Sequence, residues 1–329
     1  MKAIVQDRYG APDVLRLREI GRPAVGDDEV LVRVHAAAVN AYDWHVMRGD
    51  PYLARLSFGA LRPRQRIRGR DFAGRVAAVG LAVTGFRPGD EVYGDTGPTD
   101  GAFAEYVSVP DRHVARKPAN LTFAEAAAIP VAACTALVCL RDAARVEPGQ
   151  RVLVNGASGG VGTFAVQLAK AFGAEVTGVC RTGNVDLVRS IGADRTVDYT
   201  REDFTRDGPA YDVVLDLVGN RSLTDCRRAL APGGTLVLSG GGMSDGGSLV
   251  GPLGLFARAR ALSPFVRHRI VAPAAVTGRK NLATLRDLVE SGQVTPVIDR
   301  TYPLAEVPAA IRYLEVEHAR AKVVITCAG

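Results

Sequence analysis

The sequence predicts an α/β protein in which a β-rich region is joined to a doubly wound parallel sheet. Three observations support this. Residues 1 to about 120 hold short alternating segments separated by Gly and Pro. From about residue 122, apolar strand-like runs alternate with helical patterns. A strand, glycine turn, helix and second strand fill residues 150–180. With 329 residues, the chain is long enough for two domains with sizeable cores.

The first region is expected to form a small barrel or sandwich. Strand candidates fall at residues 30–37, 72–79, 91–93 and 102–109, with turns at Gly80 and at residues 88–90. A brief helix is possible over residues 43–49. The tail from residue 294, including 321–326, reads as β again and is expected to complete this region.

The second region begins with the capping-box pattern of Thr122 and Glu125, followed by apolar helices up to residue 144. Helices are then expected at 184–191, 222–230 and 281–290, and strands at 195–199, 211–216 and 235–239. Residues 240–247 read as a Gly-rich loop, and 249–271 allow no assignment beyond a substrate lid or a subunit contact. The expected domains are therefore 1–121 with 294–329, and 122–293.

The central unit carries the clearest chemistry. Gly156, Gly159 and Gly162 follow a strand at 151–155 and open a helix whose apolar stripe starts at Val161. Glycines let a diphosphate approach the unpaired N–H groups and the positive end of the helix dipole. Because a second strand follows at 175–180, the context favours dinucleotide binding over an ordinary Gly-rich turn.

The net charge of +6 reflects an excess of Arg without a dense basic block, so no nucleic-acid surface is expected. Arginines do alternate over residues 62–70. They are expected to lie on a solvated strand face, with a phosphate or substrate contact as the alternative.

The five cysteines form no C-x-x-C pair, which predicts reduced core thiols in a cytosolic protein. Neither a signal peptide nor an apolar run of membrane-spanning length is found. We therefore expect a cytoplasmic protein with no membrane partner.

Several short motifs, in order, carry a family resemblance. They are Met1-Lys-Ala, Ala38-Val-Asn40 with Asp43, Gly69-Arg-Asp-Phe-Ala-Gly74, Val79-Gly80, Pro88-Gly-Asp-Glu-Val92, Ala133-Cys-Thr-Ala136, Asn155-Gly-Ala-Ser-Gly-Gly-Val-Gly162, Gln167-Leu-Ala-Lys170 and Gly192-Ala-Asp194. With them the chain resembles, over nearly its whole length, the medium-chain dehydrogenase/reductase superfamily, in its zinc-free quinone oxidoreductase (zeta-crystallin-like) branch. The resemblance implies a GroES-like barrel domain, a Rossmann domain, an active site in the cleft between them, and a homodimer formed through an edge strand of the Rossmann sheet.

The resemblance also implies that zinc is absent. Zinc-dependent relatives carry a Cys near the position of Asn40 and a His-Glu pair near Arg70 and Asp71, and neither is present. A four-cysteine structural lobe is missing as well. His35 and His45 are the nearest candidate ligands and are expected to be ordinary barrel or surface histidines. Without a Lewis acid, oxidation of simple alcohols is disfavoured.

NADPH is favoured over NADH because no carboxylate stands at the end of the second strand, near Cys180. Arg181 could bind the 2′-phosphate, with Thr182 and Asn184 adding hydrogen bonds. The alternative is that Arg181 only caps the next helix. Tyr199 either flanks the adenosine, as in relatives, or packs at the sheet edge.

Family position implies the remaining cofactor contacts. Asn40 and Thr135 should lie beside the nicotinamide and its ribose, although Asn40 could instead cap a turn. The other expected contacts are Gly156, Ser158, Gly159, Gly160, Val161, Gly162, Val218, Ser239, Gly240 and Lys322. Asn40, Tyr42 and Tyr52 are the candidates for catalysis, either tyrosine orienting a carbonyl or donating a proton, unless water does so. Trp44 is expected to pack.

The predicted reaction is hydride transfer from NADPH to a quinone or to the β-carbon of an α,β-unsaturated carbonyl compound. A short-chain reductase would need a Tyr-x-x-x-Lys pair and a P-loop nucleotidase a lysine after Gly162; both are absent. From another class, the protein could bind NADPH without turnover, as a sensor, a crystallin-like protein or an RNA-binding relative.

Overall fold

The structure is a computed structural model that describes residues 1–206, 208–240, 248–274, 277–317 and 319–327. It divides into two compact units, which are described separately. The first comprises Met1–Cys134, Thr277–Gly292 and Pro296–Gly329; the second comprises Thr135–Val276 and Gln293–Thr295. The sheet of the first unit is mixed and that of the second is parallel, so the predicted α/β class is confirmed.

The first unit is built on a seven-stranded sheet in the order β14-β15-β3-β4-β5-β7, with β6 also paired to β3. Its strands are β3 (Glu29–Val39), β4 (Asp71–Val79), β5 (Glu91–Asp95), β6 (Tyr106–Pro110), β7 (Val114–Arg116), β14 (Ile298–Pro303) and β15 (Lys322–Thr326). A separate hairpin joins β1 (Lys2–Gln6) and β2 (Leu15–Glu19). The strand β15 runs antiparallel to β3, so the C-terminal tail does complete this unit.

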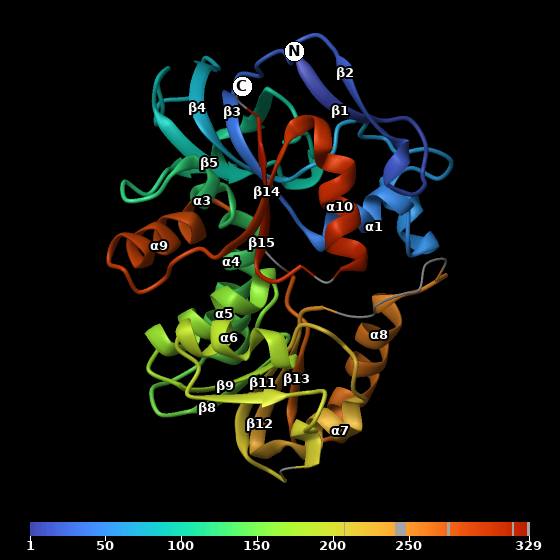
Figure 1. Cartoon of the computed structure of the whole chain (residues 1–329), viewed down its shortest axis with the longest axis vertical. Helices are drawn as coiled ribbons and strands as arrows, with labels where there is room; N and C mark the ends of the chain where they lie inside the picture. The colour runs from blue at the N-terminus through green and yellow to red at the C-terminus, as the bar shows by residue number, and fades with distance from the viewer. Residues whose placement is uncertain (207, 241–247, 275–276, 318, 328–329) are drawn as a thin grey trace. The chain divides into compact units, whose positions relative to one another are not determined.

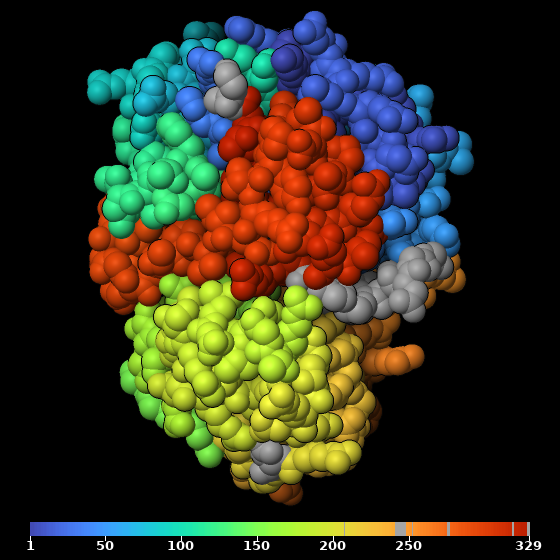
Figure 2. Space-filling view, in the orientation of Figure 1, coloured from blue at the N-terminus to red at the C-terminus, as the bar shows by residue number. Residues whose placement is uncertain are grey.

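Helices of the first unit connect and cover these strands. They are α1 (Ala41–Arg48), α2 (Arg55–Phe58), α3 (Phe123–Ala127), most of α4 (Pro130–Leu137), α9 (Arg279–Glu290) and α10 (Val307–Val316). The capping box predicted at Thr122 is present at the start of α3. The helix α10 contacts α1, and Figure 2 shows the C-terminal segment lying beside the N-terminal segment on one face of the molecule. The apolar residues of the first unit form one core that contains Phe72, Phe103 and Ile311.

The second unit has a six-stranded parallel sheet in the order β10-β9-β8-β11-β12-β13. The strands are β8 (Arg151–Asn155), β9 (Glu175–Cys180), β10 (Arg195–Asp198), β11 (Tyr211–Asp216), β12 (Leu230–Leu238) and β13 (Arg269–Val271). Figure 1 shows α5 (Gly160–Ala171) and α6 (Val185–Ser190) on one face, and α7 (Leu223–Arg228) and α8 (Pro252–Leu262) on the other. The strand order reverses between β8 and β11, which is where doubly wound sheets bind ligands.

Two segments differ from expectation. The unassigned residues 249–271 hold α8 and β13, where Arg-rich helical turns hide the apolar pattern. The helix expected to run to residue 144 is α4 followed by a π-helical segment, Val138–Ala144, which ends at Arg145 in a left-handed conformation (φ 57°). All five cysteines are buried and reduced, as predicted. Residues 241–247 of the expected Gly-rich loop lie outside the described residues.

Candidate functional site

The glycine turn of the second unit presents an open helix N-terminus. Gly159 is the N-cap of α5 and no side chain caps it, so the first N–H groups of the helix are free to bind an anion. A Cβ on Gly162 would lie 2.0 Å from the Gly156 carbonyl oxygen, whereas a Cβ on Gly159 would find that oxygen at 3.4 Å. Gly156 itself has a φ of +91°. The turn therefore needs Gly156 and Gly162 to close, and Gly159 borders open space.

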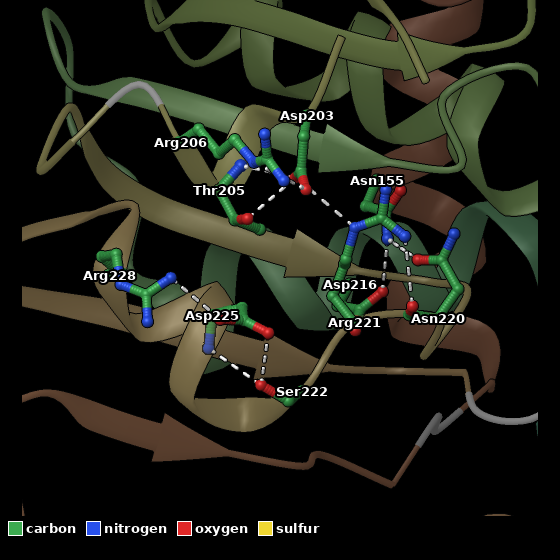
Figure 3. A network of polar contacts seen from close by, with 10 residues as sticks. All are labelled: Asn155, Asp203, Thr205, Arg206, Asp216, Asn220, Arg221, Ser222, Asp225 and Arg228. Atoms are coloured by element: carbon green, nitrogen blue, oxygen red, sulfur yellow. Dashed lines mark hydrogen bonds and ion pairs between the residues drawn. The ribbon is translucent and has the colours of Figure 1, made fainter. Parts of the chain in front are cut away.

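A buried carboxylate organises the loop that faces this turn. Asn155, at the end of β8, donates from Nδ2 to Asp216 Oδ1 at 2.9 Å and to Asn220 Oδ1 at 3.0 Å (Figure 3). The same Asp216 oxygen accepts the Val218 N–H at 3.1 Å. A Cβ on Gly156 would meet the Val218 side chain at 2.8 Å, so Val218, a predicted cofactor contact, lies against the glycine turn.

Arg221, which follows Asn220, connects this loop to Asp203. Its Nε lies 3.5 Å from Asp203 Oδ1 (Figure 3), and hydrogen bonding from Thr205 lowers the pKa of Asp203. Ser222 accepts the Asp225 N–H at 3.1 Å and so caps α7. The loop between β11 and α7 is therefore fixed at both ends by local hydrogen bonds.

The end of β12 lies beside the loop that follows β11. Ser239 donates its N–H to the Asp216 carbonyl oxygen at 3.0 Å. A Cβ on Gly240 would lie 2.1 Å from the Leu217 carbonyl oxygen, so only glycine allows this approach. Thr135, on α4, is buried at 7% exposure. These three predicted contacts belong to the second unit, like the glycine turn.

At the end of β9 the three predicted phosphate ligands differ. The Arg181 side chain is exposed and has no hydrogen-bond or ion-pair partner among the described residues. The Thr182 hydroxyl donates to Asp198 Oδ2 at 2.5 Å, and this bond lowers the pKa of Asp198. The buried Asn184 side chain donates to the Ser158 hydroxyl at 3.0 Å, so it helps to fix the glycine turn that contains Ser158. Tyr199 is 47% exposed.

A second polar centre lies in the first unit, around Asn40. Its Nδ2 donates to Asp71 Oδ2 at 3.0 Å, and its Oδ1 accepts from Lys322 Nζ at 2.7 Å. The Lys322 ammonium also lies 3.2 Å from the same Asp71 oxygen, and both residues are at most 2% exposed. Asp71 Oδ1 accepts the Val131 N–H at 2.9 Å. One buried ion pair thus joins β4, β15 and the turn after β3.

Burial raises the pKa of both carboxyl groups of this centre. Burial raises the pKa of Asp71, against the opposing effects of Lys322 and Asn40. Burial also raises the pKa of Asp43, to about 7, although its Oδ2 accepts the Asn40 N–H at 2.7 Å. Asp43 thereby holds the Asn40 backbone while Asp71 and Lys322 hold its amide, so Asn40 has a fixed orientation.

The two candidate tyrosines have different surroundings. Tyr42 lies partly buried on α1, with its ring edge-on to Phe58 at 5.9 Å between centroids. Burial raises the pKa of Tyr42 to about 12, so its phenol stays protonated. Tyr52 is 45% exposed, and the Arg55 guanidinium lies 4.6 Å above its ring. Of the two, Tyr42 lies on the helix that Asn40 caps and is affected by the charge of Asp43.

The arginines of residues 62–70 do not form a solvated strand face, and that expectation is wrong for two of them. Arg68 is 1% exposed and lies 3.0 Å from Asp100, whose pKa burial raises to about 6. Arg70 donates to Asp95 Oδ2 at 2.6 Å. The segment contains no strand, and tertiary carboxylates far along the chain draw these side chains inward. Sequence spacing carried no signal for the acceptors Asp95 and Asp100.

Comparison with known proteins identifies the family. Residues 26–119 match the alcohol dehydrogenase GroES-like domain, and residues 191–325 match the family described as zinc-binding dehydrogenase. The chain is 37% identical to the 2-methylene-furan-3-one reductase of Solanum lycopersicum over 99% of its length and 79% of that protein. It is 36% identical to the chloroplastic NADPH-dependent alkenal/one oxidoreductase of Arabidopsis thaliana, again over 99% and 79%.

Among solved structures, the quinone oxidoreductase of Coxiella burnetii is similar, with a TM-score of 0.88 and 30% identity over 100% of this chain and 99% of that one. The chain belongs to the medium-chain dehydrogenase/reductase superfamily, in its quinone oxidoreductase branch. It is therefore a nicotinamide-dependent oxidoreductase that acts on a small molecule, with a GroES-like and a Rossmann domain.

In this oxidoreductase the rings of the two candidate zinc-ligand histidines pack on other aromatic rings. His35 stacks on Phe123 at 4.4 Å, and His45 stacks on Trp44 at 3.6 Å between centroids. Burial lowers the pKa of both histidines. Trp44 packs against the core, as predicted. Within the described ranges, no three His, Cys, Asp or Glu side chains gather as a metal site, and no helix is long and apolar enough to cross a bilayer.

Proposed function

We propose that this protein is a zinc-independent, NADPH-dependent reductase that transfers hydride to a quinone or to the β-carbon of an α,β-unsaturated carbonyl compound. The names of two relatives support the substrate class. One relative is named for a 2-methylene-furan-3-one and the other for alkenals and alkenones. The solved relative named as a quinone oxidoreductase supports the quinone alternative.

The observation that carries the cofactor proposal is the unpartnered Arg181 at the end of β9, in the same unit as the open N-terminus of α5. The N–H groups of Gly160 and Val161 would hold the diphosphate. Arg181 would pair with the 2′-phosphate, because a guanidinium without a partner gains a charge-assisted bond at little cost. The nearby Asp198 already accepts from Thr182 and Thr200, so it is less available to a ribose diol.

The zinc-independent part of the proposal rests on the polar centre. Structural and catalytic zinc sites use Cys, His or carboxylate ligands in number. Here the Lys322 ammonium already donates hydrogen bonds to the Asn40 and Asp71 side-chain oxygens, and Arg70 directly precedes Asp71 in the sequence. A positively charged metal ion would have to displace a buried cation, so the residues present do not fit zinc. This differs from one matching family, zinc-binding dehydrogenase, but agrees with the zinc-free quinone oxidoreductase branch that the sequence resembles.

When bound, the reduced nicotinamide supplies a hydride, and the protein supplies orientation and a proton. We propose that Asn40, fixed by Asp43, Asp71 and Lys322, orients the reactants. Tyr42, with its raised pKa, is the favoured hydrogen-bond donor to the substrate carbonyl. Tyr52, being more exposed and paired with Arg55, is the weaker candidate.

The direct test is consumption of NADPH with a 2-alkenal or with 9,10-phenanthrenequinone, alongside elemental analysis for zinc. We expect turnover with NADPH, slower turnover with NADH, and no stoichiometric zinc. Arg181→Gln should weaken NADPH binding by about 10–100-fold, the worth of a charge-assisted hydrogen bond, and leave NADH unchanged. Arg228→Gln, an exposed arginine of the same unit paired to Asp225, is the control and should change neither.

Binding of NADPH without consumption across a broad panel would favour a non-enzymatic sensor, crystallin-like or RNA-binding role instead. Equal loss of NADPH and NADH affinity in Arg181→Gln would contradict the phosphate assignment. The homodimer, the cytoplasmic location and the absence of a nucleic-acid partner stay predictions.

A further inference from the structure

Arg70 differs from the other buried arginine of its segment. It directly precedes β4, and its carbonyl oxygen accepts the Thr96 N–H at 3.0 Å, so its backbone is fixed. Arg68, two residues earlier, is 1% exposed and paired with Asp100, whereas the Arg70 side chain keeps 22% of its surface exposed. Arg68 is therefore a closed internal ion pair, and Arg70 is a buried cation with an open side.

A rigid carboxylate holds the Arg70 guanidinium. Asp95 is fully buried, accepts Arg70 Nη2 at 2.6 Å and also accepts the Gly97 N–H at 3.0 Å. His113 Nδ1 lies 3.4 Å from its other oxygen. Because Asp95 is fixed by several groups, Arg70 has little freedom to turn. Asp95 also offsets part of the charge, so Arg70 offers aimed N–H donors more than excess positive charge.

The guanidinium carbon of Arg70 lies 5.0 Å from the centre of the Tyr42 ring. An arginine has five N–H donors, and Asp95 is the one acceptor they have within the described residues. The buried Nε has no acceptor there at all. Next to Arg70 in sequence, Asp71 holds the Asn40 amide. Arg70 therefore keeps unused N–H donors close to the Tyr42 ring.

We propose that Arg70 is an oxyanion-binding catalytic residue, which together with Tyr42 holds the carbonyl oxygen of a conjugated carbonyl substrate. This inference rests on the proposed function. As a hydride adds to the β-carbon, the C=C electron pair moves to form the enolate, whose negative charge collects on oxygen. Arg70 N–H groups stabilise that oxygen until a proton, from Tyr42 or water, reaches the α-carbon. In sum, the substrate gains a hydride, which carries two electrons, and then one proton. The dinucleotide loses the hydride and is oxidised.

The test uses a phenolate as a stable mimic of the enolate oxygen, so that it does not depend on turnover. 4-Nitrophenol is titrated by absorbance on the whole protein. Since Arg70→Met alone would leave Asp95 buried without a partner, the variant is Arg70→Met with Asp95→Asn, which removes both charges. The matched control is Arg75→Met, an arginine of β4 whose ion pair with Glu91 is 56% exposed on the arginine side.

In the wild type and in Arg75→Met we expect the bound phenol to ionise about 1–2 pH units below its value in water, the shift that charge-assisted hydrogen bonds produce. In the double variant this shift should vanish. Turnover per bound NADPH should also fall by about 10²–10³-fold there, with NADPH affinity unchanged, whereas misfolding would lower bound NADPH and turnover together.

A double variant that keeps the phenolate shift, or a wild type that shows none, would overturn the role of Arg70. Failure of the proposed function looks different: the wild type would then consume no NADPH with any alkenal or quinone, while the phenolate titration still reports on Arg70. The proposal would also be refuted if the double variant turned over quinones at the same rate per bound NADPH as the wild type.

Discussion

The buried ion pair under Asn40 allows a sharp test of the polar centre. Lys322→Met keeps the length of the side chain but removes its charge. The Asp71 carboxylate would then stay buried with hydrogen bonds from Asn40 and Val131 and no cation. Removing one partner of such a pair costs about 3–5 kcal/mol of unfolding free energy, because the remaining charge is uncompensated.

The loss should depend on pH in a defined direction. Burial already raises the pKa of Asp71, and Lys322 opposes that rise. Without Lys322 the folded-state pKa climbs further above the unfolded value of about 3.9. A carboxyl that binds its proton more tightly when folded loses stability as pH rises through this window. The cost of Lys322→Met should therefore be small below about pH 4 and grow as pH rises towards neutrality.

Urea unfolding followed by fluorescence measures this cost, since the single tryptophan, Trp44, packs in the core of the first unit. The matched control is Lys170→Met, whose ion pair with Asp194 is 36% and 40% exposed and should be worth at most about 1 kcal/mol. An equal loss in both variants, or a loss in Lys322→Met that does not change with pH, would refute the reasoning.

Three further outcomes are expected. Gly162→Ala should lower the free energy of unfolding by about 1–3 kcal/mol and abolish dinucleotide binding, because its Cβ would lie 2.0 Å from a backbone oxygen. Gly159→Ala should keep the stability and lose only dinucleotide affinity. Urea unfolding measures the stability and calorimetry the affinity; equal stabilities of the two variants would contradict the turn geometry. In steady-state assays, Tyr42→Phe should lower turnover by about 10²-fold, whereas Tyr52→Phe should not. A large loss in Tyr52→Phe and none in Tyr42→Phe would instead assign the proton donor to Tyr52. The native thiols should resist a thiol-specific reagent until unfolding, because burial raises the pKa of Cys139 and Cys180 to about 11; rapid labelling of the native protein would disprove this.

The sequence alone determined the fold class and the glycine turn before α5, because both depend on local patterns. Alternating strands, the capping box at Thr122 and the spacing of Gly156, Gly159 and Gly162 are short-range features that the structure reproduces. The polar candidates Asn40 and Lys322 came from family position, and the structure brings them within 2.7 Å although 282 residues separate them.

Only the tertiary structure decided which charges are buried and what they face. Alternating arginines suggest a solvated strand, yet Arg68 and Arg70 turn inward because Asp100 and Asp95, from distant segments, accept them. Likewise only the structure shows that Asn184, a predicted phosphate ligand, is buried and donates to the Ser158 hydroxyl. Ion pairing across long sequence separations leaves no periodic trace in the chain, since it depends on where β4 and β5 bring their ends together.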